Sequence, residues 1–330
     1  MEPVSVGTVP EFSVARVTEL QVADTAVSGP KWSPDGQWIA YSLAKGKGIG
    51  IVRADGSLRR VLTCEPGSGH RFSWAPDGSG IAFRTTPEAD APRRHVIRVV
   101  TMENGEIEHS SGVEADLQPP VWQAGPEGMR WVSHSPGCGM VAGPWQKLSR
   151  MELSGAAQTV TPPLLAAHSR SIWLHAEGSA PLRKLSGDFG LNPVWNRQGT
   201  RFAFDARDVV AVSSPEAQDG PQMLFAGQHP AWSPDGRWIA YQLTRDHTHT
   251  AEDTRQHTAD TLPHLHDDKT NHRIVDSELW ICAADGDGRR QLTFTPDLLE
   301  EDPDWSPDGR CIVCHLENSG RLLLLHLNQP

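Results

Sequence analysis

One short pattern recurs along the chain and limits the folds available to it more than any other feature. The pattern reads Trp-Ser-Pro-Asp-Gly and is followed by alternating apolar residues. Its copies are PKWSPDGQWIAYS from Pro30, FSWAPDGSGIAFR from Phe72, PVWNRQGTRFAFD from Pro193, PAWSPDGRWIAYQ from Pro230, PDWSPDGRCIVCH from Pro303 and a weaker one, PVWQAGPEGMRWVSH, from Pro120. A chain with such an internal repeat is expected to fold as an array of similar units.

Each copy predicts a β-hairpin. Pro fixes φ, Asp can accept a hydrogen bond from its own backbone and Gly tolerates positive φ, so Pro-Asp-Gly closes a tight turn with little strain. A second hairpin follows several copies, as in IGIVRADGSLRRVLT from Ile49, VIRVVTMENGEIEHSS from Val96 and LWICAADGDGRRQLT from Leu279. Four strands per repeat predict the blades of an all-β propeller.

Tryptophan ends the first strand of each copy, and the chain contains 12 tryptophans. A blade cannot cover both of its own faces, so it must pack on its neighbours. Burying one indole removes roughly 150–250 Å² from water, and we expect these side chains to be the wedges between sheets. The six motif residues are Trp32, Trp74, Trp122, Trp195, Trp232 and Trp305.

Two of the intervals between motif tryptophans, those after Trp122 and Trp232, are about twice the shortest interval. The first of these contains two further hairpin candidates, from Ser149 and from Ser171, and we expect a degenerate blade there. Seven blades are therefore favoured over six.

The ring needs one more strand, because the last repeat stops after a third strand in RLLLLHLNQP. The segment EFSVARVTEL, from Glu11, ends like the fourth strand of other repeats. We predict that it completes the last blade, which would remove an exposed sheet edge. Residues 1–10 are then an N-terminal tail, and residues 11–330 form one propeller domain.

Composition excludes several classes of protein. Apolar residues make up 38% of the chain and charged residues 22%, as in globular proteins. A formal charge of −11 argues against binding to a nucleic-acid backbone, which draws its affinity from Lys and Arg. The first thirty residues lack a signal-peptide pattern and no run of eighteen apolar residues occurs, so we expect a cytoplasmic protein without a membrane span.

The five cysteines form no pairs of metal-binding type. Cys311 and Cys314 have a redox-like spacing, but they lie in the run RCIVCHL, which is typical of a strand. Residues three apart in a strand point to opposite faces. We therefore interpret both thiols as buried and inert.

The repeats resemble those of the TolB-like β-propellers, in which Trp-Ser-Pro-Asp-Gly is followed by Ile-Ala-Phe or Ile-Ala-Tyr, then Asp-Gly and Leu-Thr. The resemblance covers nearly the whole chain and implies the propeller fold. Similar propellers serve as periplasmic scaffolds, as gating domains of prolyl-oligopeptidase-type peptidases and as metal-dependent oligogalacturonate lyases, so it implies no single function. The segment before Trp32 leaves no room for TolB's N-terminal domain, and the peptidases' Gly-x-Ser-x-Gly pentapeptide is absent. We expect a bare propeller.

One face of such a ring collects the loops from the second to the third strand and from each blade to the next. We predict that residues just before each motif line the mouth of the ring: Ser28, His70, Gln118, Asn192, His229 and Asp302, with Glu301 beside the last. The mixed charges suit a polar ligand or a peptide. Glu300, Glu301 and Asp302 are either an amine-binding cluster or a solvated acidic loop. No catalytic residue is predicted.

An unusual insertion spans residues 243–280 and holds six of the fifteen histidines. Imidazoles are ligands for manganese, zinc or nickel, and we predict a divalent transition-metal site from His247, His249, His264 and His266. The resemblance to the lyases, which hold manganese with histidines near the channel, supports the same prediction. Two alternatives are a solvated loop and a loop that responds to pH, since histidine gains charge below about pH 7.

Three functions remain open. The leading hypothesis is a non-catalytic scaffold that binds a protein or peptide, because no catalytic motif is present. The alternatives are a metal-dependent lyase or hydrolase acting on acidic oligosaccharides, and a propeller that binds or senses a small molecule.

Overall fold

The structure, a computed structural model, describes residues 12–87, 93–125, 128–135, 139–144, 164–168, 171–175, 183–186, 189–217, 219–248, 273–295 and 298–328. These residues are almost entirely in strands and tight turns, apart from one short 3₁₀ helix, η1 (Ala44–Gly46). None of their helical segments has the length and hydropathy needed to cross a membrane.

The described strands form seven antiparallel sheets, numbered here in chain order. Sheet 1 contains β2 (Val27–Trp32), β3 (Trp38–Leu43), β4 (Ile49–Arg53) and β5 (Arg59–Thr63). Sheet 2 contains β6 (Phe72–Trp74), β7 (Gly80–Thr85), β8 (Arg94–Thr101), β9 (Ile107–Ser110) and β10 (Glu114–Ala115). Sheet 3 contains β11 (Val121–Gly125), β12 (Gly128–Ser135) and β13 (Gly139–Pro144). Sheet 4 contains β14 (Leu164–His168), β15 (Ser171–His175) and β16 (Arg183–Lys184).

The remaining three sheets have four strands each. Sheet 5 contains β17 (Leu191–Trp195), β18 (Phe202–Ala206), β19 (Val209–Ser213) and β20 (Gln222–Ala226). Sheet 6 contains β21 (Gln228–Trp232), β22 (Trp238–Thr248), β23 (Arg273–Ala283) and β24 (Arg290–Gln291). Sheet 7 contains β25 (Glu300–Trp305), β26 (Cys311–Leu316), β27 (Arg321–Asn328) and β1 (Ser13–Gln21).

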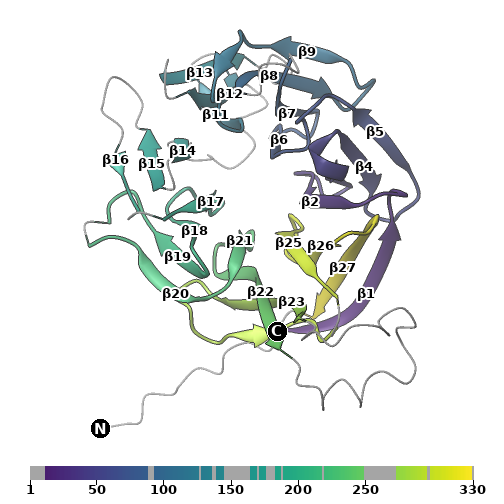
Figure 1. The fold of residues 1–330 in the computed structure, drawn as a ribbon, viewed down its shortest axis with the longest axis vertical. Coiled ribbons are helices and arrows are strands. Elements are labelled where there is room, and N and C mark those ends of the chain that lie inside the picture. Colours follow the sequence, from purple (N-terminus) through teal and green to yellow (C-terminus); the bar gives the residue numbers. More distant parts are fainter. Residues whose placement is uncertain are drawn as a thin grey trace.

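The sheets follow one another around a ring, with the first strand of each repeat nearest the centre (Figure 1). Sheet 4 lies between Trp122 and Trp195, where the sequence predicted a degenerate repeat, and it includes the hairpin candidate from Ser171. The other candidate, from Ser149, lies outside the described residues. The seven described sheets agree with the favoured blade number, and the total for the whole ring stays a prediction.

The N-terminal strand pairs with the C-terminal one. Strand β1 lies beside β27 at the outer edge of sheet 7, and the register runs from Ser13 opposite Asn328 to Gln21 opposite Arg321 (Figure 1). The backbone amide of Val22 also donates to Gly320 O at 2.8 Å. The sequence predicted that the N-terminal segment supplies the fourth strand of the last repeat, and β1 occupies that place.

The recurring turn is held by the hydroxyl of its serine. Ser33 Oγ donates to Asp35 Oδ1 at 2.6 Å and accepts from the backbone amide of Trp38 at 2.9 Å. Gly36 has a φ of 70°, which only glycine adopts readily. The same bonds recur in the turns that begin at Ser233 and Ser306. The motif is therefore a self-contained hairpin turn, as predicted.

The motif tryptophans join neighbouring sheets. Trp232 is buried against apolar side chains of sheets 5 and 6, and its indole N–H donates to Val194 O of sheet 5 at 3.1 Å. Trp74 and Trp122 make the equivalent bonds, to Lys31 O at 3.1 Å and Ser73 O at 3.0 Å. Each indole thus combines apolar burial with a backbone hydrogen bond to the preceding sheet.

The histidine-rich insertion is shorter than the sequence indicated. Residues 243–248 and 273–280 belong to β22 and β23, which pair without interruption as far as Thr248 opposite Arg273. Within the predicted limits of 243–280, these two segments are therefore paired strands rather than loop. The polar composition of these segments concealed a strand pair that extends beyond the length of the equivalent pair in sheet 1, and residues 249–272 lie outside the described part of the chain.

The indole bond can be tested inside one chain. Trp232→Phe keeps an aromatic ring but removes the donor to Val194, whereas the buried indole N–H of Trp305 has no hydrogen-bond partner among the described residues. We expect Trp232→Phe to lower the free energy of unfolding by about 1 kcal/mol more than Trp305→Phe does. Urea unfolding of both variants measures the difference, and equal losses would contradict the role given to the bond.

Candidate functional site

One backbone position brings polar side chains to the centre of the ring. The residue three before the motif tryptophan has positive φ in five sheets. In four of them the ladder also shifts register there, which marks a β-bulge. Bulges redirect the side chain of a strand residue. The five residues, with their φ values, are Gly29 (55°), Arg71 (62°), Asn192 (51°), His229 (53°) and Asp302 (55°).

A second position lies on the following strand, ten residues after the motif tryptophan. Its occupants are Ser42, Arg84, Asp205, Gln242 and His315. Two of these side chains accept hydrogen bonds from the bulge of the next sheet, and Asp205 Oδ1 accepts from the backbone amide of His229 at 2.8 Å. Gln242 Oε1 accepts from the amide of Asp302 at 2.9 Å. Residues from these two positions, together with Glu301 beside Asp302, line the ring centre and are here called the central cluster: Arg71, Asn192, Asp205, His229, Glu301, Asp302 and His315.

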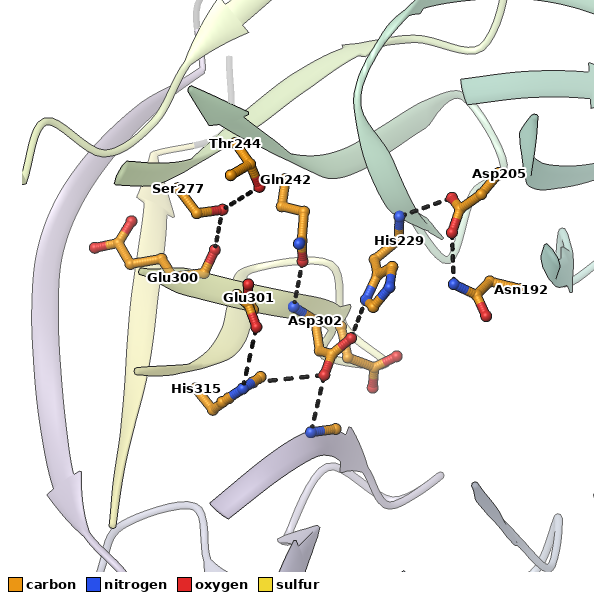
Figure 2. A network of polar contacts seen from close by, with 12 residues as sticks. Asn192, Asp205, His229, Gln242, Thr244, Ser277, Glu300, Glu301, Asp302 and His315 are labelled. Atoms are coloured by element: carbon orange, nitrogen blue, oxygen red, sulfur yellow. Dashed lines mark hydrogen bonds and ion pairs between the residues drawn. The ribbon is translucent and has the colours of Figure 1, made fainter. Parts of the chain in front are cut away.

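Asp302 occupies the middle of this cluster (Figure 2). Its carboxylate is bonded to His229 Nδ1 and to the backbone amide of Gly29 at 3.1 Å, and its Oδ2 lies 3.6 Å from His315 Nδ1. Burial opposes the charge, but the hydrogen bond and charge of His229, together with the charges of His315 and Lys31, hold the pKa of Asp302 well below its usual value. Asp302 is therefore a permanent anion at neutral pH.

His229 is the hydrogen-bonding partner of Asp302. Burial works to lower the pKa of His229, but the hydrogen bond to Asp302 and the charges of Asp302, Asp205 and Glu301 outweigh it, so the pKa lies above its usual value. On the other side, Asp205 is buried and accepts from Asn192 Nδ2 (Figure 2). Burial raises the pKa of Asp205, against the charge of His229.

Glu301 has a weaker set of partners. Its Oε2 lies 3.7 Å from Nε2 of the buried His315, beyond hydrogen-bonding distance. Burial, and then the charges of Asp302 and Glu317, raise the pKa of Glu301 to about 7. Burial also lowers the pKa of His315, so this ring is neutral at neutral pH and does not balance the carboxylate.

Arg71 supplies a second positive charge at the centre. Its guanidinium interacts electrostatically with Asp205 and Asp302, which lie in sheets 5 and 7, while Arg71 itself belongs to sheet 2. Burial lowers the pKa of Arg71 and those two carboxylates oppose the effect. Within the described part of the chain its guanidinium makes no hydrogen bond, and the residue is exposed to solvent. It is a charged donor surrounded by protein and open to a ligand.

Of the seven residues predicted for the mouth, the structure brings together Asn192, His229, Glu301 and Asp302. His70 lies one residue before the bulge position, and its ring packs against Gly46. Arg71 takes the central position instead, and counting back three residues from Trp74 identifies it. Ser28 is one position early in the same way, before Gly29. Whether these residues bind a ligand stays a prediction.

Asp205 and His315 were missed because they lie inside apolar strands rather than in loops. Each is a polar residue in an otherwise apolar run, FAFDA and CIVCHL, at the same distance from its motif tryptophan. That shared spacing is the signal that identifies them.

The predicted metal ligands cannot be placed. His249, His264 and His266 lie outside the described residues, and of His247 only the backbone, in β22, is described. The described residues hold no group of three or more His, Cys, Asp or Glu arranged for a metal ion. The metal site stays a prediction. Cys311 and Cys314 are buried in β26, as expected, and burial raises the pKa of Cys311 to about 12 and that of Cys314 well above its usual value.

No protein-family model and no curated protein matches the sequence. Among solved structures, the chain is similar to the β-propeller domain of Cps50 (Swd1) from Myceliophteria thermophila, with 12% identity and a TM-score of 0.56, over 95% of this chain and 99% of that one. It also matches putative TolB from Agrobacterium tumefaciens, with 13% identity and a TM-score of 0.49, over 98% of this chain and 99% of that one.

A further match is TolB from Acinetobacter baumannii, with 17% identity and a TM-score of 0.48 over 86% of this chain. The match spans 57% of the length of that TolB chain. The likeness to the Cps50 domain agrees with the ring of antiparallel sheets. The fold is a β-propeller, as the TolB-like repeats predicted.

The raised pKa of Glu301 implies that this carboxyl lowers stability at alkaline pH. Its folded pKa of about 7 lies above the ordinary 4.5, so the unfolded chain ionises first and stability falls as pH rises from about 4.5 to 7. We expect Glu301→Gln to raise the free energy of unfolding by about 1–3 kcal/mol at pH 8 and to change it little at pH 4.5. Urea unfolding at both values measures this, with the exposed Glu103→Gln as control. An equal effect of Glu301→Gln at the two pH values would contradict the assignment.

Proposed function

We propose that the protein is a non-catalytic propeller that binds a peptide segment of a partner protein at the central cluster. The observation that carries the proposal is the guanidinium of Arg71, which makes no hydrogen bond within the described residues and lies in a ring centre that also presents the carboxylates of Glu301 and Asp302. A peptide can offer a carboxylate to Arg71 and a cationic group to Glu301. The backbone amides and carbonyls between these groups suit the polar lining.

The polarity of the site supports a peptide over a compact metabolite. Pockets for small organic molecules are lined mostly by apolar and aromatic side chains, with few polar groups. The central cluster is the reverse, since all of its residues are polar or charged and they come from sheets 2, 5, 6 and 7. A peptide can meet these groups with the polar groups of its backbone as well as with its side chains.

The unbalanced charges also support a binding role. The side chain of Glu301 has no hydrogen-bonding partner among the residues that the structure describes, and its raised pKa of about 7 costs stability at neutral pH. Binding sites commonly retain such groups because their partner is the ligand. A cationic side chain placed beside Glu301 would lower its pKa and recover this cost.

Peptide selection tests the proposal whatever the partner protein is. A random dodecapeptide library would be selected against the intact protein, and the affinities of the enriched peptides measured by isothermal titration calorimetry. We expect enriched sequences to combine an acidic and a basic residue. Arg71→Glu is expected to weaken their binding at least tenfold, because it replaces attraction by repulsion at a charged contact.

The matched control is Arg237→Glu. Arg237 is an exposed arginine in a Pro-Asp-Gly turn, and it forms an ion pair with Asp235 of the same turn. This variant should bind the enriched peptides as the unmodified protein does. Absence of any enriched sequence, or equal affinity for Arg71→Glu and the unmodified protein, would refute a peptide site at the central cluster.

A further inference from the structure

Sheets 1 and 6 share the run Trp-Ile-Ala-Tyr, which places Tyr41 and Tyr241 at equivalent positions. In sheet 1 the hydroxyl of Tyr41 donates to Val22 O at 3.0 Å. Nearby, Arg59 Nη1 donates to Gln21 O at 3.0 Å. Both acceptors are carbonyls of the chain that leads from β1 into β2. Two donors of sheet 1 are thus satisfied by one inter-sheet connection.

Sheet 6 contains the same two donors without the acceptors. Arg289 is the equivalent of Arg59, because RRQLT and RRVLT occupy the same place after the Asp-Gly turn. The connection from β20 to β21 is Gly227 alone, whereas five residues, 22–26, separate β1 from β2. Within the described residues, neither the hydroxyl of Tyr241 nor the guanidinium of Arg289 makes a hydrogen bond, although Tyr241 is only 1% exposed.

A cavity of about 550 Å³ lies where the longer connection would run. Its lining is Ala226 of β20, Tyr241, Leu243 and Trp280 of β22 and β23, and the turn 286–289. Trp280 pairs with Tyr241 as Gly50 pairs with Tyr41 in sheet 1, so the cavity has an aromatic wall that sheet 1 lacks. The guanidinium carbon of Arg289 lies 6.0 Å from the centre of the ring of Phe225, which belongs to the facing sheet 5.

We propose that this cavity binds a small aromatic monocarboxylate. Its two carboxylate oxygens would accept from Tyr241 and Arg289, in place of the two backbone carbonyls that serve the equivalent donors of sheet 1. Its aromatic body would pack against Trp280 and Leu243. Guanidinium groups bind carboxylates well because their paired donors match the two oxygens.

The size and charge of the cavity narrow the ligand further. A volume of about 550 Å³ lies within the range of known small-molecule sites, which is about 300–1,000 Å³. Among the described lining residues Arg289 is the one cation and Asp287 adds a carboxylate, so a ligand with one negative charge is favoured over one with two, which would meet repulsion. Burial raises the pKa of Tyr241, which keeps its hydroxyl protonated as a donor at any physiological pH.

Calorimetric titration with benzoate, phenylacetate and 1-naphthylacetate tests the proposal on the intact protein. We expect saturable binding of at least one acid and none of its neutral amide, which lacks the charge. Arg289→Gln should weaken binding about tenfold or more, the loss expected for a charge-assisted hydrogen bond. Tyr241→Phe should also weaken it, and a circular-dichroism melt of each variant separates loss of binding from loss of fold.

Arg59→Gln is the matched control, because it makes the same change at the equivalent position of sheet 1, where the donor is already satisfied. This variant should keep the full affinity. Failure of all three acids to bind, or equal weakening by Arg59→Gln and Arg289→Gln, would overturn the proposal. Neither outcome bears on the peptide site, which lies at the ring centre and involves none of these residues.

Discussion

The packing of each sheet on the next, through the motif indole, is the interaction on which the rest of the structure depends. The indoles of Trp74, Trp122 and Trp232 fill the space between sheets, and each donates to a carbonyl on the innermost strand of the preceding sheet. This contact fixes how one inner strand lies against its neighbour. Side chains separated from the motif tryptophan by the same number of residues therefore lie at equivalent places around the ring centre. Residues that are far apart in the sequence can in this way form one polar lining.

Local sequence was sufficient to predict the hairpins, the strand that β1 adds beside β27 and the degenerate sheet 4. Each of these depends on short-range chemistry, such as the Ser33–Asp35 turn, or on a count of strands. The site was harder to predict. His70 was chosen in place of Arg71 because a bulge changes which residue of a strand turns inward, and a shift of one residue exchanges one face for the other. Asp205 was overlooked because its contact with His229 joins two sheets.

The charges of the central cluster differ in how well they are balanced. Asp302 has His229 and the amide of Gly29 as partners, so its ionisation supports the fold. Glu301 and Arg71 lack comparable partners, and burial disfavours the charged form of each. One small region thus contains a pair that holds neighbouring sheets together and two groups whose charges remain available to a ligand.

The pairing of β1 with β27 also governs the order in which the molecule can be completed during synthesis. Ser13 leaves the ribosome long before Asn328, its partner in the ladder, so the first strand must wait until almost all of the chain has emerged. Contacts so distant in sequence form slowly, because the loop between them must close first. Until that moment the edge of β1 that later pairs with β27 has no ladder partner, and a nascent chain in this state offers that edge to a neighbouring polypeptide.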